Sequence, residues 1–220
     1  MSTERDFNYS KFLTGQKLVL TDQKIQDYKI AELQCDIIEI HNCVFQNVLF
    51  QNTFKDASVC IQNCEFINCE FADTYENAVF VMVDSMLKNC IFEGIKIHDS
   101  TGLQLSFSNN QLYECKFKNI KIDAGIKIAG NKMQGGSLEN FWCCSKTQVG
   151  KVGNEISHMK MKNVAVMADM TGTRMKNLSF ENVTLEWSKS LEGFYIENCD
   201  ATGFTLILER YSHYVKNLVL

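Results

Sequence analysis

The sequence predicts an all-β chain wound as a right-handed, quadrilateral parallel β-helix with loop insertions and terminal caps. Three observations favour this fold class: apolar residues return every five positions, asparagines keep a fixed place in that period, and the 220 residues include no proline. A helix repeats its apolar face every 3.6 residues and a half-buried strand every 2, so a period of five fits neither element alone.

The period of five is clearest in residues 60–71, "CIQNCEFINCEF", where the unit Cys-x-Phe recurs after five residues. Between residues 18 and 50, thirteen of the 14 positions in step are apolar. Random placement at the overall apolar content would give about six. The pattern slips in phase several times and continues to residue 206, so five-residue order covers most of the chain.

The asparagines give an independent check of the period, because the period was found from the apolar residues alone. Of 19 asparagines, 14 lie directly before the first member of an apolar pair or before the position where the period of five places the next pair. Asn tolerates left-handed backbone and bonds its side chain to nearby backbone groups. We therefore expect turns at these 14: Asn42, Asn47, Asn52, Asn63, Asn68, Asn89, Asn109, Asn119, Asn140, Asn163, Asn177, Asn182, Asn198 and Asn217.

The geometry follows from these two patterns. Two inward side chains separated by one outward residue make a short extended piece, and a turn after each piece bends the chain through one corner. Four corners close a square, so about twenty residues make one coil, and coils stack as parallel ladders at roughly 4.8 Å. The lack of proline suits such a fold, because almost every backbone N–H is needed in a ladder.

The apolar pairs of the five-residue period also predict which side chains fill the interior of the coils. Small residues fill the first inward site of each pair, and Phe, Leu or Ile fills the second. We expect the structural core to include Cys43, Phe45, Cys64, Phe66, Cys69, Phe71, Cys90, Phe92, Cys115, Phe117, Leu178 and Phe180.

The chain is predicted to have three parts. Residues 1–17 are an N-terminal cap, residues 18–206 the β-helix, and residues 207–220 a C-terminal cap or dimerisation tail. Caps are expected because a stack of coils otherwise exposes unpaired strand edges. Loop insertions are expected at 144–158 and 186–193, and we expect the first loop to contact a partner, because loops on a rigid scaffold often carry binding residues.

The units Cys43-Val-Phe45, Cys64-Glu-Phe66, Cys69-Glu-Phe71, Cys90-Ile-Phe92 and Cys115-Lys-Phe117 resemble the repeat A(D/N)LXX of the pentapeptide-repeat family. The resemblance spans roughly residues 18–206 and departs from the family in its phase slips and its many Val and Ile pairs. It implies a solenoid that acts without catalysis. One branch of the family mimics DNA and binds type II topoisomerases such as gyrase, and the quinolone-resistance members, similar in length, form homodimers through their tails.

Charge limits the partners. The net charge is −4, which argues against direct nucleic-acid binding through a basic field. Residues 1–110 carry 8 basic and 15 acidic side chains, so one end is acidic and compatible with a DNA mimic. The Lys-rich segment 115–132 in the other half is not what a full-length DNA mimic would display.

The ten cysteines are expected to be structural thiols. The first residues form no apolar signal segment and no stretch of 18 apolar residues occurs, so we expect a cytoplasmic protein without disulfides or membrane contact. No CxxC pair is present, and neither the cysteines nor the four histidines have metal-ligand spacing, so no metal or cofactor is expected. Of Cys143 and Cys144, one must face outward.

The enzymatic alternative is a carbohydrate-active parallel β-helix, a lyase or hydrolase. Such sites need carboxylates in register on one face. The outward candidates Glu39, Glu65 and Glu70 are isolated and interleaved with Lys. We therefore favour a non-catalytic protein that acts on a protein partner, with a topoisomerase as candidate and a role in resistance or immunity. The sequence names no binding residues.

Overall fold

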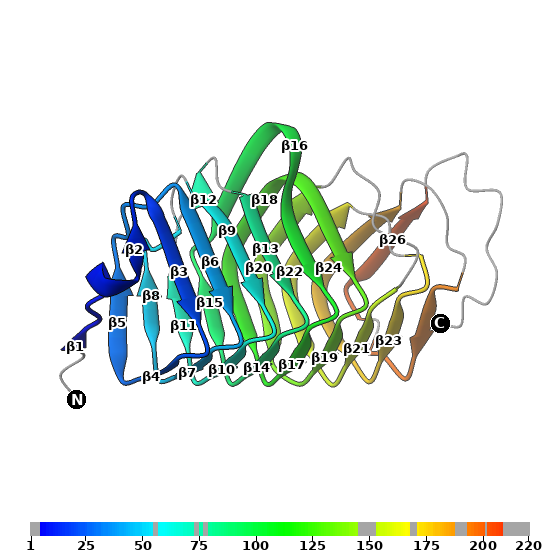
Figure 1. The fold of residues 1–220 in the computed structure, drawn as a ribbon. Helices are drawn as coiled ribbons and strands as arrows, with labels where there is room; N and C mark the ends of the chain where they lie inside the picture. The colour runs from blue at the N-terminus through cyan, green and yellow to red at the C-terminus, as the bar shows by residue number, and fades with distance from the viewer. Residues whose placement is uncertain are drawn as a thin grey trace.

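The fold is taken from a computed structural model that describes residues 5–54, 57–72, 75–76, 79–144, 153–167, 171–187, 193–200 and 202–208. Within these residues the only helix is a single 3-10 turn, η1 (Ser10–Phe12). All other elements are strands, and they stack side by side along one axis as the coils of a parallel β-helix (Figure 1). The predicted fold class is confirmed.

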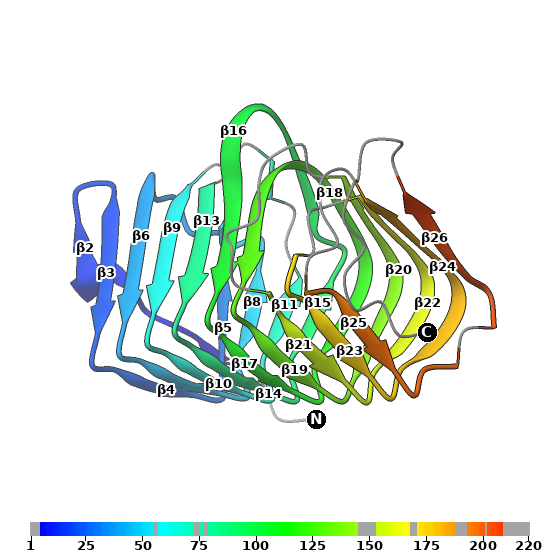
Figure 2. The same cartoon turned by 90° about the vertical axis from the view of Figure 1, so that its right-hand side faces the viewer.

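Each early coil has four faces, which we number in chain order. Face two is a separate nine-stranded parallel sheet, which runs along the lower side of the molecule in Figures 1 and 2. Its strands are three residues long and alternate outward, inward, outward. They are β4 (Lys24–Gln26), β7 (Val44–Gln46), β10 (Glu65–Ile67), β14 (Met86–Lys88), β17 (Gln111–Tyr113), β19 (Lys132–Gln134), β21 (Glu155–Ser157), β23 (Arg174–Lys176) and β25 (Tyr195–Glu197).

The other faces share a 17-stranded sheet. Face one begins with β3 (Lys17–Thr21), β6 (Ile37–His41), β9 (Ser58–Gln62) and β13 (Val79–Val83). Face three begins with β5 (Tyr28–Ala31), β8 (Leu49–Gln51), β11 (Glu70–Ala72) and β15 (Ile91–Glu93). On face four the short strand β12 (Tyr75–Glu76) pairs with the next coil. Successive face-one strands start at residues 17, 37, 58 and 79, so each coil takes about twenty residues, as predicted.

Later strands run around corners, which differs from the expected turn at every fifth residue. β16 (Lys96–Ser108) passes from face four to face one of the next coil, and β18 (Lys116–Ala129) covers faces three, four and one. Fifteen positions separate the turn residues Gly94 and Asn109, against eleven between Asn52 and Asn63. The extra residues are taken up by shifts in register, and β16 arches away from the stack (Figure 1).

The remaining strands extend the large sheet to the last coil. β20 (Ser137–Cys144), β22 (Lys160–Met167) and β24 (Ser179–Trp187) cover faces three and four, and β26 (Phe204–Leu208) lies on face four. At the other end, β1 (Arg5–Asp6) pairs with β5, and β2 (Leu13–Thr14) makes an antiparallel pair with β3. Phe7, Phe12 and Leu13 pack against the first coil and cover its apolar interior.

The predicted asparagine turns are confirmed. Thirteen of the 14 named asparagines have φ between 47° and 57°, in the left-handed region, and Asn217 lies outside the described residues. Their side chains also join neighbouring coils: Nδ2 of Asn163 donates to Oδ1 of Asn140 at 3.0 Å, and Nδ2 of Asn140 donates to Oδ1 of Asn119 at 2.9 Å. One side chain therefore serves both the turn and the stacking of coils.

The twelve residues named as core lie inside the coils. Eleven are at most 5% exposed, and Phe117 is half-buried. Inward rings at one position form a continuous stack, with centroid distances of 4.8 Å from Phe50 to Phe71, 4.5 Å from Phe71 to Phe92 and 4.8 Å from Phe92 to Phe117. Burial of these rings supplies a large share of the apolar stabilisation.

Candidate functional site

Three late strands of the large sheet end on the same side of the solenoid. The described chain stops at Cys144, Met167 and Trp187, each the last residue of a strand on face four, and resumes just before face two. The arch of β16 crosses the same edge, between faces four and one (Figures 1 and 2). We call this edge the insertion side. At the other three corners most of the described coils have a left-handed residue, such as Asp22, Asn47 and Asn52.

The loop predictions fall mostly outside the described residues. Of the predicted loop 144–158, residues 145–152 are outside them, and of 186–193, residues 188–192 are outside them. The predicted tail 207–220 is described only for residues 207 and 208, which belong to β26. The sequence did not predict that both insertions start from one face.

An apolar strip lies on the outer surface of face four, beside the insertion side. Trp142 is 37% exposed and Ile207 is 42% exposed. Strand pairing aligns Trp142 with Ala165, and Cys144 with Met167. We call Trp142, Cys144, Ala165, Met167 and Ile207 the face-four strip.

Polar groups hold and border the face-four strip. Nζ of Lys121 lies 5.3 Å from the centroid of the Trp142 ring, a cation–π contact that orients the indole. Sγ of Cys144 contacts Sδ of Met167 at 3.6 Å. Glu186 aligns with Met167 on one side and Ile207 on the other. Glu186 therefore interrupts the strip between Met167 and Ile207. An oriented, part-exposed Trp beside charged groups resembles the centre of a protein-binding surface.

All ten cysteines are free thiols. Cys143 is buried and Cys144 is half-buried at the surface, so one of the pair faces outward, as predicted. Burial, together with a smaller contribution from the neighbouring Cys144, raises the pKa of the Cys143 thiol to about 12. Burial also raises the pKa of Cys60, which aligns with Glu39 on face one. Both thiols are therefore protonated near neutral pH and are weak nucleophiles.

The carboxylates considered for carbohydrate chemistry do not meet. Glu39 lies on face one and pairs with Lys17 at 2.8 Å, Glu65 lies on face two, and Glu70 lies on face three. Among the described side chains, no three His, Cys, Asp or Glu residues form a group that could hold a metal ion. The same part of the chain has no helix long and apolar enough to cross a membrane.

Turn geometry decides the architecture. A left-handed residue follows each short strand, two inward side chains occupy each face, and four such faces complete a coil. The chain is a parallel β-solenoid of four-sided coils. The solenoid is irregular, because β16 and β18 run through the corner between faces four and one without a separate turn.

Comparisons with known proteins add only weak likenesses to this solenoid. The chain matches no family model, and no curated protein resembles it in sequence. Full-length QnrB1, a plasmid-mediated fluoroquinolone resistance protein, is 12% identical over 89% of this chain and 94% of that chain, with a TM-score of 0.37. A trypsin-treated QnrB1 variant is 15% identical over 89% and 91% of the two chains, with a TM-score of 0.35. The assignment above rests on the geometry of the coils.

A buried polar ladder at the corner between faces one and two was missed by the sequence analysis. Backbone N–H groups donate to the side chain one coil further on: Ser85 to Asn110 at 2.9 Å, Asn110 to Asn131 at 2.9 Å, and Asn131 to Asn154 at 3.1 Å. Nδ2 of Asn131 returns a hydrogen bond to the carbonyl of Phe107 at 2.8 Å. The signal was present, since these residues occupy the first inward site in successive coils.

Proposed function

We propose that the protein acts without catalysis and binds another protein through the face-four strip. The observation that carries the proposal is Trp142, which is part-exposed and oriented by Lys121 on a rigid sheet. Side chains on a fixed ladder lose little conformational freedom on binding, which favours affinity. The predicted loop at 144–158, which follows β20, is proposed to contact the same partner.

The charge pattern supports a mixed surface better than a duplex-like one. Lys and Glu of neighbouring coils pair on the outer faces, with Lys162–Glu181 at 2.8 Å, Lys176–Glu197 at 3.2 Å and Lys132–Glu155 at 3.6 Å. A DNA mimic needs unbroken rows of negative charge. We therefore place the partner contact on the face-four strip rather than on an acidic face.

A type II topoisomerase such as gyrase is the partner that we propose to test first, with a role in resistance or immunity. The free thiols support a reducing compartment such as the cytoplasm. The tail at 207–220 is our proposed homodimer contact. Light scattering on a chain that ends near residue 204 should then give the monomer mass, whereas an unchanged dimer mass would exclude the tail.

The experiment compares Trp142→Ala with Val79→Ala, because both side chains are 37% exposed and Val79 lies on a different face, in β13. Binding to purified gyrase is measured by interferometry, together with protection of supercoiling against a quinolone. Loss of a central Trp should weaken binding at least about tenfold, and Val79→Ala should not. Equal binding by all three proteins would exclude the strip, and no binding by the wild type would exclude gyrase.

A broader capture experiment separates the two parts of the proposal. Wild type and Trp142→Ala are used as bait in a lysate of the native host, and the captured proteins are identified by mass spectrometry. A partner other than gyrase that the Trp142→Ala bait fails to retain would support the strip alone. A version with residues 145–152 replaced by a short turn should lose the partner while its thermal unfolding stays nearly unchanged.

A further inference from the structure

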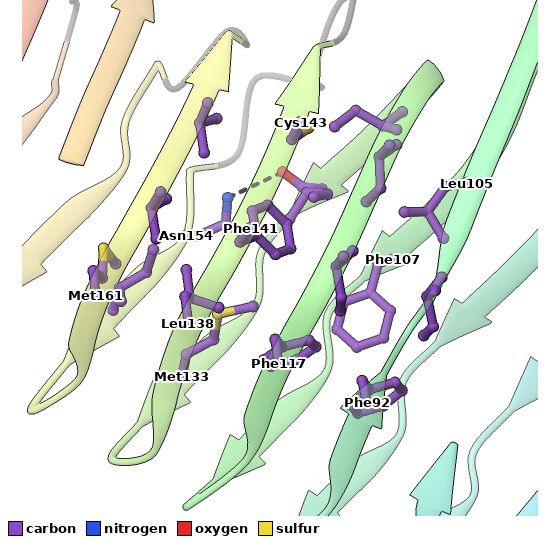
Figure 3. A pocket seen from close by; sticks show the side chains of 18 of the residues that line it. Phe92, Leu105, Phe107, Phe117, Met133, Leu138, Phe141, Cys143, Asn154 and Met161 are labelled. Atoms are coloured by element: carbon purple, nitrogen blue, oxygen red, sulfur yellow. Dashed lines mark hydrogen bonds between the residues drawn. The ribbon is translucent and has the colours of Figure 1, made fainter. Parts of the chain in front are cut away.

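A cavity of about 170 Å³ lies inside the solenoid beneath the insertion side. Figure 3 shows side chains from neighbouring strands pointing into it, with Phe92, Phe107, Phe117 and Phe141 among them. The lining extends from Phe80 in β13 to Leu185 in β24, which belong to the fourth and eighth coils. At roughly 4.8 Å per coil, these lining residues span about 19 Å along the axis.

The cavity exists because the interior side chains become smaller there. The ring stack from Phe50 to Phe117 ends at Leu138, and Met161 follows in register. At the neighbouring inward site, Cys115 is followed by Gly136, which brings no side chain. A Cβ at Gly136 would collide with the carbonyl oxygen of Cys115, so this site cannot be filled by a simple substitution.

The core is divided at the same place. One cluster of buried residues extends from Leu18 to Cys143, and a second extends from Met159 to Ile196. Partly buried Met133, Phe141 and Val166 pack against both clusters and also line the cavity. Atoms that face a void lose their dispersion contacts, so an occupant that restores these contacts stabilises the fold.

Among the described lining residues, polar side-chain groups are few. Asn154 is the described lining residue with a polar amide, and this amide takes part in the buried ladder. Its Nδ2 donates to the carbonyl of Ile128 at 3.0 Å, drawn as the dashed line in Figure 3, and its Oδ1 accepts from Nδ2 of Asn131 at 2.9 Å. The thiol of Cys143, also in the wall, is protonated near neutral pH.

We propose that this cavity is a binding site for an uncharged aliphatic hydrocarbon group, such as an alkyl chain. An apolar cavity of about 150 Å³ stays dry because its walls are apolar, and it has room for a small hydrocarbon or xenon. The lining of Ile, Leu, Val and Met methyl groups from successive coils suits a narrow, extended chain. Charged or hydrogen-bonding molecules are excluded because their polar groups would be desolvated without a partner.

The experiment titrates the full-length protein with n-hexane, using 1,4-dioxane as a polar probe of similar size. Methyl NMR spectra of Ile- and Met-labelled protein report the contact site, and calorimetry reports thermal unfolding. We expect saturable shifts at Ile120, Ile122 and Met161 with n-hexane, a higher unfolding temperature, and no shift at Ile37, which lies outside on face one. An absence of saturable shifts at the lining methyl groups overturns the proposal.

A filled cavity gives the decisive control. Leu138→Phe continues the ring stack into the void, and Ser179→Phe adds the same ring at an exposed position of β24. We expect Leu138→Phe to weaken hexane binding at least tenfold and Ser179→Phe to leave it unchanged. If Leu138→Phe does not fold, Val164→Ile adds a single methylene to the wall and should weaken binding about fourfold. Equal hexane affinity in folded filled variants would overturn the proposal.

Discussion

Nδ2 of Asn109 donates a hydrogen bond to Oδ1 of Asp84 at 3.3 Å, which joins two turn residues 25 positions apart in sequence. Both residues have left-handed φ and occupy the corner between faces one and two. Two coils earlier, Nδ2 of Asn63 donates to Oδ1 of Asn42 at 2.8 Å. Asp84 lacks a side-chain N–H, so it cannot donate to Asn63 and the ladder of amides is interrupted there.

Replacing Asp84 by Asn should complete this ladder. Asp84→Asn supplies the missing donor to Asn63 while keeping a residue that tolerates left-handed backbone, so the free energy of unfolding should rise by about 0.5–1.5 kcal/mol. Urea unfolding measures the change.

Asp22→Asn is the matched control for this substitution. Asp22 has φ 55° and holds the same corner in the first coil, so the substitution makes the same change of charge without an asparagine below it. An equal gain in both variants would assign the effect to charge and backbone preference, and would contradict a role for the amide ladder.

The buried ladder should matter more than the exposed one. Asn131→Leu keeps the approximate volume but leaves the N–H of Asn110 and the carbonyl of Phe107 without these partners. Each buried group left unpaired costs about 1–3 kcal/mol, so a loss of about 2–4 kcal/mol is expected in urea unfolding. Gln134→Leu, at an exposed position of β19, should change the free energy of unfolding by no more than about 0.5 kcal/mol. A loss below 1 kcal/mol for Asn131→Leu would contradict the ladder.

The ring stack should be sensitive at its middle. Phe71 lies against Phe50 and Phe92, whereas Phe180 has a stacked partner at 4.7 Å in Phe204 at the end of the solenoid. Phe71→Leu should therefore cost about 1–3 kcal/mol, and Phe180→Leu less. Thermal unfolding of the two variants tests the order, and a larger loss at Phe180 would contradict it.

Stability should fall at alkaline pH through Cys143. Its pKa is about 12 in the folded chain, above the ordinary value of 9.0, because the buried thiolate is desolvated. The raised pKa favours the protonated folded state, so this contribution is intact below pH 9.0 and is lost as pH rises toward 12. The slope from this thiol is about 1.4 kcal/mol per pH unit.

Comparison with Cys143→Val isolates this contribution, since Tyr and Lys side chains also titrate in the same range. The difference in unfolding free energy between wild type and Cys143→Val should be constant up to pH 9.0 and should then decline for the wild type. Parallel curves up to pH 11 would show that the thiol ionises as easily in the folded chain as in the unfolded one.

The sequence predicted the repeating parts of the fold because one residue type served each role. Asn marked the turns, and Cys-x-Phe units such as Cys64 and Phe66 marked the interior. Turns at Asp22, Asp27, Glu32, Glu114 and His158 followed only from the period of five and not from residue type, because these residues enter left-handed backbone less often than Asn.

The candidate site was beyond sequence reasoning for a different reason. Trp142 and Ile207 lie 65 positions apart, and their shared face depends on how many residues each intervening coil contains. The slips in phase hide that number. The cavity was hidden in the same way, because it depends on which of Leu138, Gly136 and Met161 stack on the rings of the preceding coils.

The most direct test of the solenoid is a through-space NMR measurement on Phe-labelled protein. The account predicts cross-peaks between the rings of Phe50 and Phe71, Phe71 and Phe92, and Phe92 and Phe117, which stack one coil apart at centroid distances of 4.5 to 4.8 Å. A lack of these peaks, with contacts confined to residues three or four positions apart, would contradict a chain wound into stacked coils.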